Sequence, residues 1–75
     1  SSLRNTVLIT GANGLLGQWL LRVFREDYEV HALGLQAQPR LPGGHFQYHA
    51  GDITDREFLR DLAQAIMPQF IINAA

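Results

Sequence analysis

A glycine-rich turn at residues 10–17 (TGANGLLG) is the feature that most constrains this chain. It follows residues 6–9 (TVLI), an apolar run typical of a buried parallel strand, and it opens a helical pattern of apolar residues. A turn this tight needs residues that tolerate positive φ or close backbone approach, which Gly11, Asn13 and Gly14 supply. The pattern therefore predicts a strand that passes through a glycine corner into a helix.

The start of that helix is a predicted anion site. The first two glycines let a pyrophosphate approach the unpaired backbone N–H groups of Leu15 and Leu16, where the helix dipole also favours negative charge. Gly17 lies one turn into the helix, where a missing side chain lets helix and strand pack closely. Strand, glycine turn and helix in this order form a dinucleotide-binding fingerprint. The alternative is a plain strand-to-helix corner, since glycine-rich turns are common.

Length and composition limit what the chain can be. Its 75 residues, 47% hydrophobic and 17% charged, suit one small α/β layer structure, whereas a complete oxidoreductase normally needs several times that length. We therefore expect residues 1–75 to be the N-terminal part of a dinucleotide-binding domain, with the catalytic and substrate-binding portions outside the chain.

Charge and residue usage exclude several kinds of partner. A net charge of −1 gives no reason to expect nucleic acid or a membrane as partner. The chain has no cysteine, which excludes disulfides and thiolate metal sites. The first residues lack the apolar core of a signal peptide, so a cytoplasmic protein is expected.

The order of elements predicts an α/β fold. After the first helix, at residues 14–25, three further strands and a second helix are expected, at residues 29–34, 45–50 and 69–75 and at residues 55–67. Thr54 and Glu57 form a capping box before the second helix. This alternation is typical of a Rossmann-type doubly wound parallel sheet, here its N-terminal portion, with strand order 3-2-1-4 and a helix on each face. The fourth strand would leave an apolar edge open, so the isolated segment is expected to self-associate, and homo-oligomer formation stays open.

The end of the second strand predicts which cofactor is bound. An acidic residue there would bind the adenosine ribose and repel a 2′-phosphate, which selects NAD. This position holds Gly34, followed by Leu35 and Gln36, and the next charged residue is Arg40. The missing acid and the nearby cation favour NADP(H), with Gln36 and Arg40 at the ribose end. NAD(H) stays the alternative if Arg40 is a solvated loop cation.

A carboxylate just past the third strand is the second informative feature. Ligands collect at the edge where parallel strands end, so Asp52 is a candidate binding residue. His31 alternates with apolar neighbours and is interpreted as a strand histidine. His45 and His49 have no further ligands at a defined spacing, so no metal site is expected.

Three stretches carry a family resemblance: residues 7–17 (VLITGANGLLG), 51–55 (GDITD) and 68–75 (PQFIINAA). Together they resemble the extended short-chain dehydrogenase/reductases, and most closely the dTDP-4-dehydrorhamnose reductase family. The resemblance implies NAD(P)H-dependent reduction of the 4-keto group of a nucleotide-linked deoxysugar. The nucleotide sugar would be bound by the portions outside the chain.

The resemblance also implies contacts to the cofactor. Asp52 would accept a hydrogen bond from the adenine amino group, and the backbone of Ile53 would line the ring. Ala74 and Ala75, at the end of the fourth strand, would leave room for a ribose or the nicotinamide.

No catalytic residue is expected in these 75 residues. The family chemistry uses a Tyr-x-x-x-Lys pair and a Ser or Thr, in which the tyrosine protonates the carbonyl oxygen and the lysine lowers the tyrosine pKa. Four residues after Tyr28 and Tyr48 stand Ala32 and Asp52, and the chain contains no lysine. Two alternatives stay open. One is a non-catalytic NADP-binding regulator resembling the methionine adenosyltransferase β subunit, and the other is an NAD-dependent sugar-nucleotide epimerase or dehydratase that holds its cofactor tightly.

Overall fold

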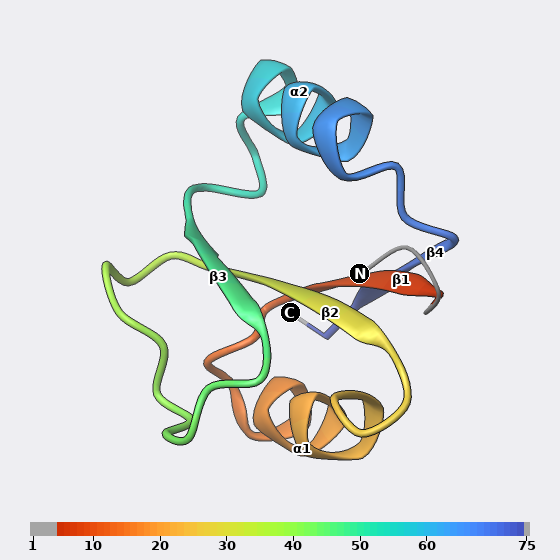
Figure 1. Ribbon diagram of the computed structural model, residues 1–75. Helices are drawn as coiled ribbons and strands as arrows, with labels where there is room; N and C mark the ends of the chain where they lie inside the picture. Colours follow the sequence, from red (N-terminus) through yellow and green to blue (C-terminus); the bar gives the residue numbers. More distant parts are fainter. Residues whose placement is uncertain (1–4, 75) are drawn as a thin grey trace.

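The apolar runs of the sequence form one parallel sheet in the computed structural model, which describes residues 5–74. Its strands are β1 (Thr6–Thr10), β2 (Glu29–Gly34), β3 (Gln47–Ala50) and β4 (Phe70–Asn73), in the spatial order β3-β2-β1-β4 (Figure 1). Within the sheet, Val7 of β1 lies opposite Val30 on one side and Phe70 on the other. The predicted strand order 3-2-1-4 of a Rossmann-type sheet is confirmed.

Two helices lie on opposite faces of this sheet (Figure 1). α1 (Leu15–Phe24) connects β1 to β2, and α2 (Arg56–Ile66) connects β3 to β4. Because every pairing is parallel, the carboxyl ends of the strands share one edge, where ligands bind in this class of sheet. Within residues 5–74, neither helix has the length and apolar character needed to cross a membrane.

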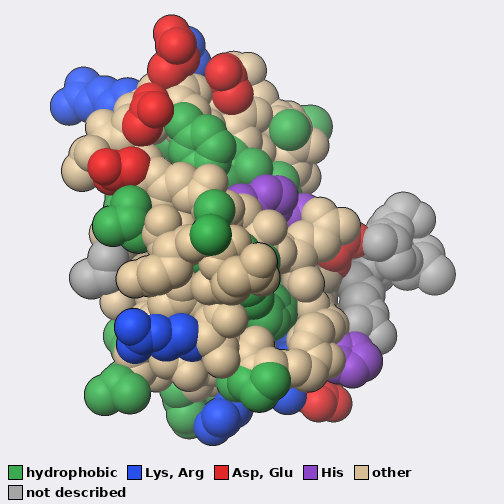
Figure 2. Space-filling model, turned by 90° about the vertical axis from the view of Figure 1, so that its left-hand side faces the viewer, with side chains coloured by type: hydrophobic (Ala, Val, Ile, Leu, Met, Phe, Trp, Pro, Cys, Tyr) green, Lys and Arg blue, Asp and Glu red, His purple; other side chains and the backbone are tan. Residues whose placement is uncertain are grey.

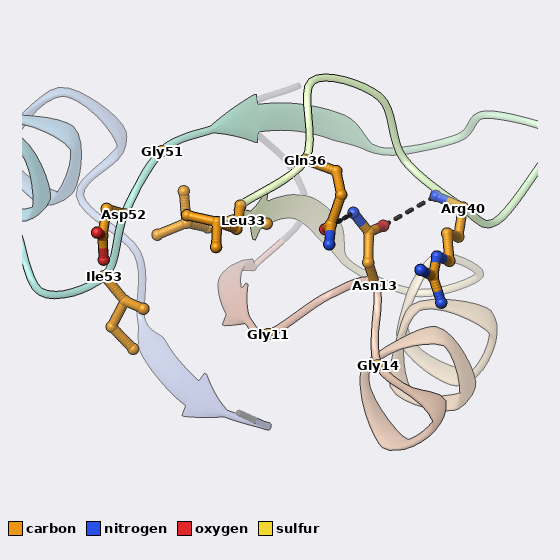
Figure 3. A pocket seen from close by; sticks show the side chains of 11 residues that line it. Gly11, Asn13, Gly14, Leu33, Gln36, Arg40, Gly51, Asp52 and Ile53 are labelled. Atoms are coloured by element: carbon orange, nitrogen blue, oxygen red, sulfur yellow. Dashed lines mark hydrogen bonds between the residues drawn. The ribbon is translucent and has the colours of Figure 1, made fainter.

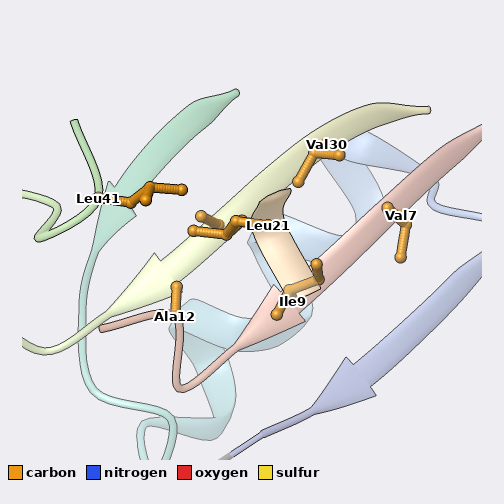
Figure 4. Packing of buried hydrophobic residues seen from close by; sticks show 7 residues of the cluster. Val7, Ile9, Ala12, Leu21, Val30 and Leu41 are labelled. Carbon is orange, nitrogen blue, oxygen red and sulfur yellow. The ribbon is translucent and has the colours of Figure 1, made fainter. Parts of the chain in front are cut away.

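The hydrophobic core fills the layer between α1 and the sheet (Figure 4). It consists of Val7, Ile9, Ala12, Leu21, Val30, Ala32 and Leu41, none of them more than 3% exposed. Burying one Val, Leu or Ile side chain contributes roughly 1.5–3 kcal/mol relative to leaving it in water. This layer therefore holds α1 against the strands.

The α1 helix is apolar on more than one side. Gly17 and Leu21 are buried against the sheet, whereas Leu15 is 91% exposed and Trp19 is 58% exposed. Beyond the helix end, the Tyr28 ring contacts Phe24 and Phe70, with centroid distances of 5.0 and 5.8 Å. These ring contacts link the end of α1 to β4.

Several element boundaries differ from prediction by one or two residues, and two of these differences have a clear physical reason. β3 begins at Gln47 and not at residue 45, because His45 has φ 69, in the left-handed region that strands do not use. α2 begins after Asp55, whose carboxylate accepts a hydrogen bond from the Phe58 backbone N–H at 3.1 Å. Asp55 is therefore the N-cap, and the predicted capping box of Thr54 and Glu57 is wrong.

Candidate functional site

The glycine turn places only its first glycine in the left-handed region. Gly11 has φ 68, and its carbonyl accepts a hydrogen bond from the Gly14 N–H at 3.2 Å. Gly14 is the N-cap of α1 with φ −76. Within residues 5–74, the non-glycine residues with positive φ are His45 and Met67. Of the three residues predicted to allow a positive φ or close backbone approach, Gly11 alone therefore uses a positive φ, and Asn13 and Gly14 do not.

Gly17 lets α1 sit directly on the turn. A Cβ at this position would collide with the Gly11 carbonyl oxygen and lie 2.8 Å from Ala12 Cα, so glycine is required by space, as its packing role predicts. The first turn of α1 thereby meets the carboxyl edge of the sheet. The backbone N–H groups of Leu15 and Leu16 have no acceptor within the described part of the chain, and such groups at a helix N-terminus favour an anion.

Asn13 joins the turn to the loop after β2 through its side chain, which is only 7% exposed. Its Nδ2 group donates to Gln36 Oε1 at 2.7 Å and to the Tyr48 hydroxyl at 3.0 Å, with a longer contact of 3.3 Å to the Gln38 carbonyl. Its Oδ1 atom accepts from the Arg40 backbone N–H at 2.8 Å. A buried amide with both ends satisfied fixes its neighbours strongly. Asn13 therefore sets the position of the loop that carries Gln36 and Arg40.

Asp52 lies two residues after the end of β3, and its carboxylate accepts hydrogen bonds. Its Oδ1 atom accepts from the Thr54 backbone N–H at 2.9 Å and from the Thr54 hydroxyl at 2.8 Å. These two hydrogen bonds, the backbone one first, hold the pKa of the Asp52 carboxyl below its ordinary value, against the weaker opposing effect of burial. Just before it, the Gly51 N–H donates to the Gly34 carbonyl at 2.9 Å and keeps the ends of β2 and β3 together.

A pocket of about 370 Å³ opens along this edge. It is lined by Gly11, Asn13, Gly14, Leu33, Gly34, Leu35, Gln36, Arg40, Gly51, Asp52 and Ile53. Asp52 and Ile53 lie at one end, Arg40 at the other, and the glycine turn lies between them (Figure 3). In Figure 2 acidic side chains gather at the top, on the α2 side, while most of the lower side chains that carry charge are basic. The pocket thus has an acidic end and a basic end.

His31 is held in the sheet by two polar contacts, as its interpretation as a strand histidine expects. Its Nδ1 lies 3.0 Å from His49 Nε2 on β3, and its Nε2 lies 3.3 Å from Glu29 Oε2. The two imidazole rings stack at a centroid distance of 5.3 Å. Burial, and then the charge that His31 carries when protonated, lower the pKa of His49.

Comparison with known proteins agrees with this geometry. Residues 7–75 match the NAD dependent epimerase/dehydratase family. The chain belongs to that family. This epimerase/dehydratase-family chain therefore lies within the extended short-chain dehydrogenase/reductases, as its motifs indicate. Its likeness to the dTDP-4-dehydrorhamnose reductases stays a prediction.

Two relatives illustrate the similarity. GDP-mannose 4,6 dehydratase of Drosophila melanogaster is 32% identical over 83 aligned residues, which cover 91% of this chain and 21% of the relative. The crystal structure of the PbgP3 protein from Burkholderia pseudomallei has a TM-score of 0.75 at 27% identity, over 93% of this chain and 22% of that one. The chain spans about a fifth of the length of these two proteins.

The pocket of this epimerase/dehydratase-family chain contains most of the residues that the sequence predicts for cofactor binding. Those inside it are Gly11, Asn13, Gly14, Gln36, Arg40, Asp52 and Ile53. Leu15, Leu16 and Gly17 stand beside it in the first turn of α1. Leu33, Leu35 and Gly51 also line the pocket, although the sequence patterns did not predict them as binding residues. Their places at or just after the ends of β2 and β3 were a usable signal.

Of the two predicted alanine contacts, the one that the structure describes, Ala74, lies outside the lining of this pocket. The Ala74 N–H donates to the Thr10 carbonyl at 3.0 Å, and the Thr10 hydroxyl donates to Asn73 Oδ1 at 3.0 Å. Ala74 therefore extends the pairing of β1 and β4 and is absent from the pocket lining. Ala75 falls outside the described residues. A contact of either alanine with the cofactor stays a prediction.

Proposed function

We propose that this chain is the cofactor-binding part of a nicotinamide-dependent enzyme that acts on a nucleotide-linked sugar. The observation that carries the proposal is the pocket with Arg40 at one end, Asp52 at the other and the glycine turn between them. Residues 1–75 would form the N-terminal part of a Rossmann domain, and the catalytic and sugar-binding residues would come from portions outside the chain.

The residues present fit an adenine dinucleotide. The N–H groups of Leu15 and Leu16 supply donors for its pyrophosphate at the start of α1. The Asp52 carboxylate supplies an acceptor for the adenine amino group, and Ile53 lines the same end of the pocket. The volume of about 370 Å³ lies within the range of small-molecule sites. Once bound, such a cofactor supplies hydride transfer.

The ribose end of the pocket supports NADP(H) over NAD(H). Gly34 brings no carboxylate that would repel a 2′-phosphate, and the exposed Arg40 guanidinium makes no ion pair with any residue in the range 5–74. A guanidinium is well suited to bind a phosphate. The family description names NAD, so NAD(H) remains the alternative cofactor.

Two reactions are candidates. The resemblance of residues 68–75 supports reduction of the 4-keto group of a nucleotide-linked deoxysugar by an exchangeable NAD(P)H. The family description and the dehydratase relative support epimerisation or dehydration, in which an oxidised cofactor would accept a hydride from the sugar and return it within one turnover. An enzyme of the second kind gains from keeping its cofactor bound.

Calorimetric titration of the full-length protein with NADPH and NADH tests the proposal. We expect NADPH to bind more tightly, and Arg40→Gln to weaken NADPH by about tenfold, as loss of a charged hydrogen bond would. Arg56→Gln, on the outer side of α2, is the matched control and should leave both affinities unchanged. Failure of both cofactors to bind would contradict the proposal. Cofactor released from the purified, denatured protein would favour the epimerase or dehydratase over the reductase.

A further inference from the structure

The position at the end of β2 is closed to any side chain. A Cβ at Gly34 would lie 2.5 Å from the Tyr48 hydroxyl oxygen and 2.9 Å from Asn13 Nδ2. Both separations are shorter than Cβ atoms normally allow, so an acidic residue cannot occupy position 34 while Tyr48 and Asn13 keep their places. Gly34 does not have positive φ, so the need for glycine here comes from space and not from backbone conformation.

The Tyr48 side chain is held firmly where it blocks this position. Its backbone pairs with Ala32 of β2, and its ring packs against the core beneath α1. Its hydroxyl donates to the Gln36 carbonyl at 2.6 Å and accepts from Asn13 Nδ2 at 3.0 Å. Sheet register, core packing and two hydrogen bonds thus fix one hydroxyl in the space next to Gly34.

We propose that Tyr48 is a specificity-determining, positioning residue for the cofactor. Its neutral hydroxyl occupies the space that the Cβ of an acidic residue at position 34 would need, so no carboxylate there repels a 2′-phosphate. Through Asn13, which also holds the Arg40 backbone N–H at 2.8 Å, it fixes the loop that carries the phosphate-binding cation. The inference rests on the proposed function and adds the residue that makes the adenosine end of the pocket selective.

A consequence is that cofactor preference depends on positions 34 and 48 together. Gly34→Asp alone introduces a carboxylate against the Tyr48 hydroxyl and distorts the Asn13 contacts. Tyr48→Phe removes the oxygen atom nearest to the new Cβ, and the ring carbon Cε1 at 3.1 Å then needs only a small shift. Asn13 Nδ2, released from Tyr48, can turn away from the Cβ and donate to an acid at position 34. Tyr48→Phe alone should therefore only reduce the preference for a 2′-phosphate, whereas the paired change should favour a cofactor with a free 2′-hydroxyl.

The test is a double-mutant cycle on the full-length protein. Gly34→Asp, Tyr48→Phe and the double variant are titrated with NADPH and NADH, and with 2′,5′-ADP and 5′-ADP as probes of the adenosine end alone. We expect Tyr48→Phe to weaken NADPH and 2′,5′-ADP by about fivefold, because the loop that carries Arg40 loses both hydrogen bonds of the Tyr48 hydroxyl, with less than half that effect on NADH and 5′-ADP. Gly34→Asp should weaken all four, and the double variant should recover NADH and 5′-ADP but not the phosphorylated pair.

Tyr28→Phe is the matched control, because Tyr28 packs on Phe24 and Phe70 away from the pocket, and it should change none of the four affinities. Circular dichroism confirms that each variant is folded. Independent, additive effects of the two substitutions, or an unchanged preference in Tyr48→Phe, would overturn the inference while leaving the proposed function intact. If the unsubstituted protein binds none of the four ligands, the proposed function fails and the specificity role fails with it.

Discussion

The two faces of the sheet are packed to different degrees. On the α1 face, seven core residues are at most 3% exposed, and Gly17 brings the helix into contact with the turn. On the α2 face, Leu8 and Leu33 of the sheet are buried, yet no residue of α2 itself is. The α1 face therefore holds the glycine turn firmly in place, whereas α2 depends more on its polar N-cap, Asp55.

The largest expected effect compares one leucine from each helix. Leu21→Ala should lower the free energy of unfolding by about 2–5 kcal/mol, because it leaves a cavity in the closed core. Leu62→Ala should cost roughly 1–2 kcal/mol, since Leu62 is only partly removed from water. Urea unfolding of the full-length protein measures both. Equal losses would show that the two faces are packed alike.

The next comparison uses two glycines of the same turn. Gly17→Ala should cost about 1–3 kcal/mol, because its Cβ meets backbone atoms of Gly11 and Ala12 that cannot move away cheaply. Gly14→Ala should change stability far less, since its Cβ would lie 3.5 Å from the Gly11 carbonyl oxygen. Thermal unfolding of both variants checks the expectation. A neutral Gly17→Ala would mean that α1 can shift on the sheet.

On the α2 face, the N-cap decides the stability of the helix start. Asp55→Ala should cost about 1 kcal/mol, because the Phe58 N–H loses its acceptor. Thr54→Ala serves as the control and should stay within about 0.5 kcal/mol, because the exposed Thr54 side chain bonds to Asp52 and does not cap the helix. Hydrogen exchange of the α2 amides should rise in Asp55→Ala alone. A larger effect of Thr54→Ala would restore the capping box predicted from sequence.

The smallest expected effect is a pH dependence on the α2 face. His31 and His49 lie there, because they alternate along their strands with residues that face α1. The pKa of His49 is lowered in the folded state, so the unfolded chain binds more protons and stability falls as the pH drops below the ordinary histidine value of about 6.5. His49→Gln should flatten this slope in urea unfolding between neutral and mildly acidic pH. The exposed His45→Gln is the control, and an unchanged slope in His49→Gln would reject the assignment.

Patterns within short windows of sequence predicted most of the fold. The apolar runs that became β1, β2 and β4, the alternation with helices and the glycine turn are local signals, and they were enough for the strand order. The local pattern also predicted a helix cap at Thr54. The neighbouring Asp55 caps the helix instead, because its carboxylate accepts the hydrogen bond from the Phe58 N–H. The residue types around His45 do not show that its backbone is left-handed. The predicted start of β3 at residue 45 was therefore two residues too early.

The site was less predictable where it depends on contacts between distant residues. Asn13 was chosen for its backbone tolerance, but its role comes from hydrogen bonds to Gln36 and Tyr48, 23 and 35 residues further along the chain. Gly34 was interpreted only as the absence of an acid, because no local pattern shows that the Tyr48 hydroxyl fills its space. Asp52, by contrast, could be predicted as a residue of the pocket from its position just after a parallel strand alone.

The position of β4 beside β1 has a consequence for the order of assembly. The hydrogen bond from Thr10 to Asn73 closes a loop of 63 residues, whereas the bond from Asn13 to Gln36 closes one of 23. Loop-closure entropy makes the longer connection costlier by about 0.9 kcal/mol. During synthesis, β1, α1 and β2 are all available before β4 is made. We therefore expect the glycine turn to form first and β4 to pair with β1 last. A nascent chain halted before β4 would then already contain the folded glycine turn.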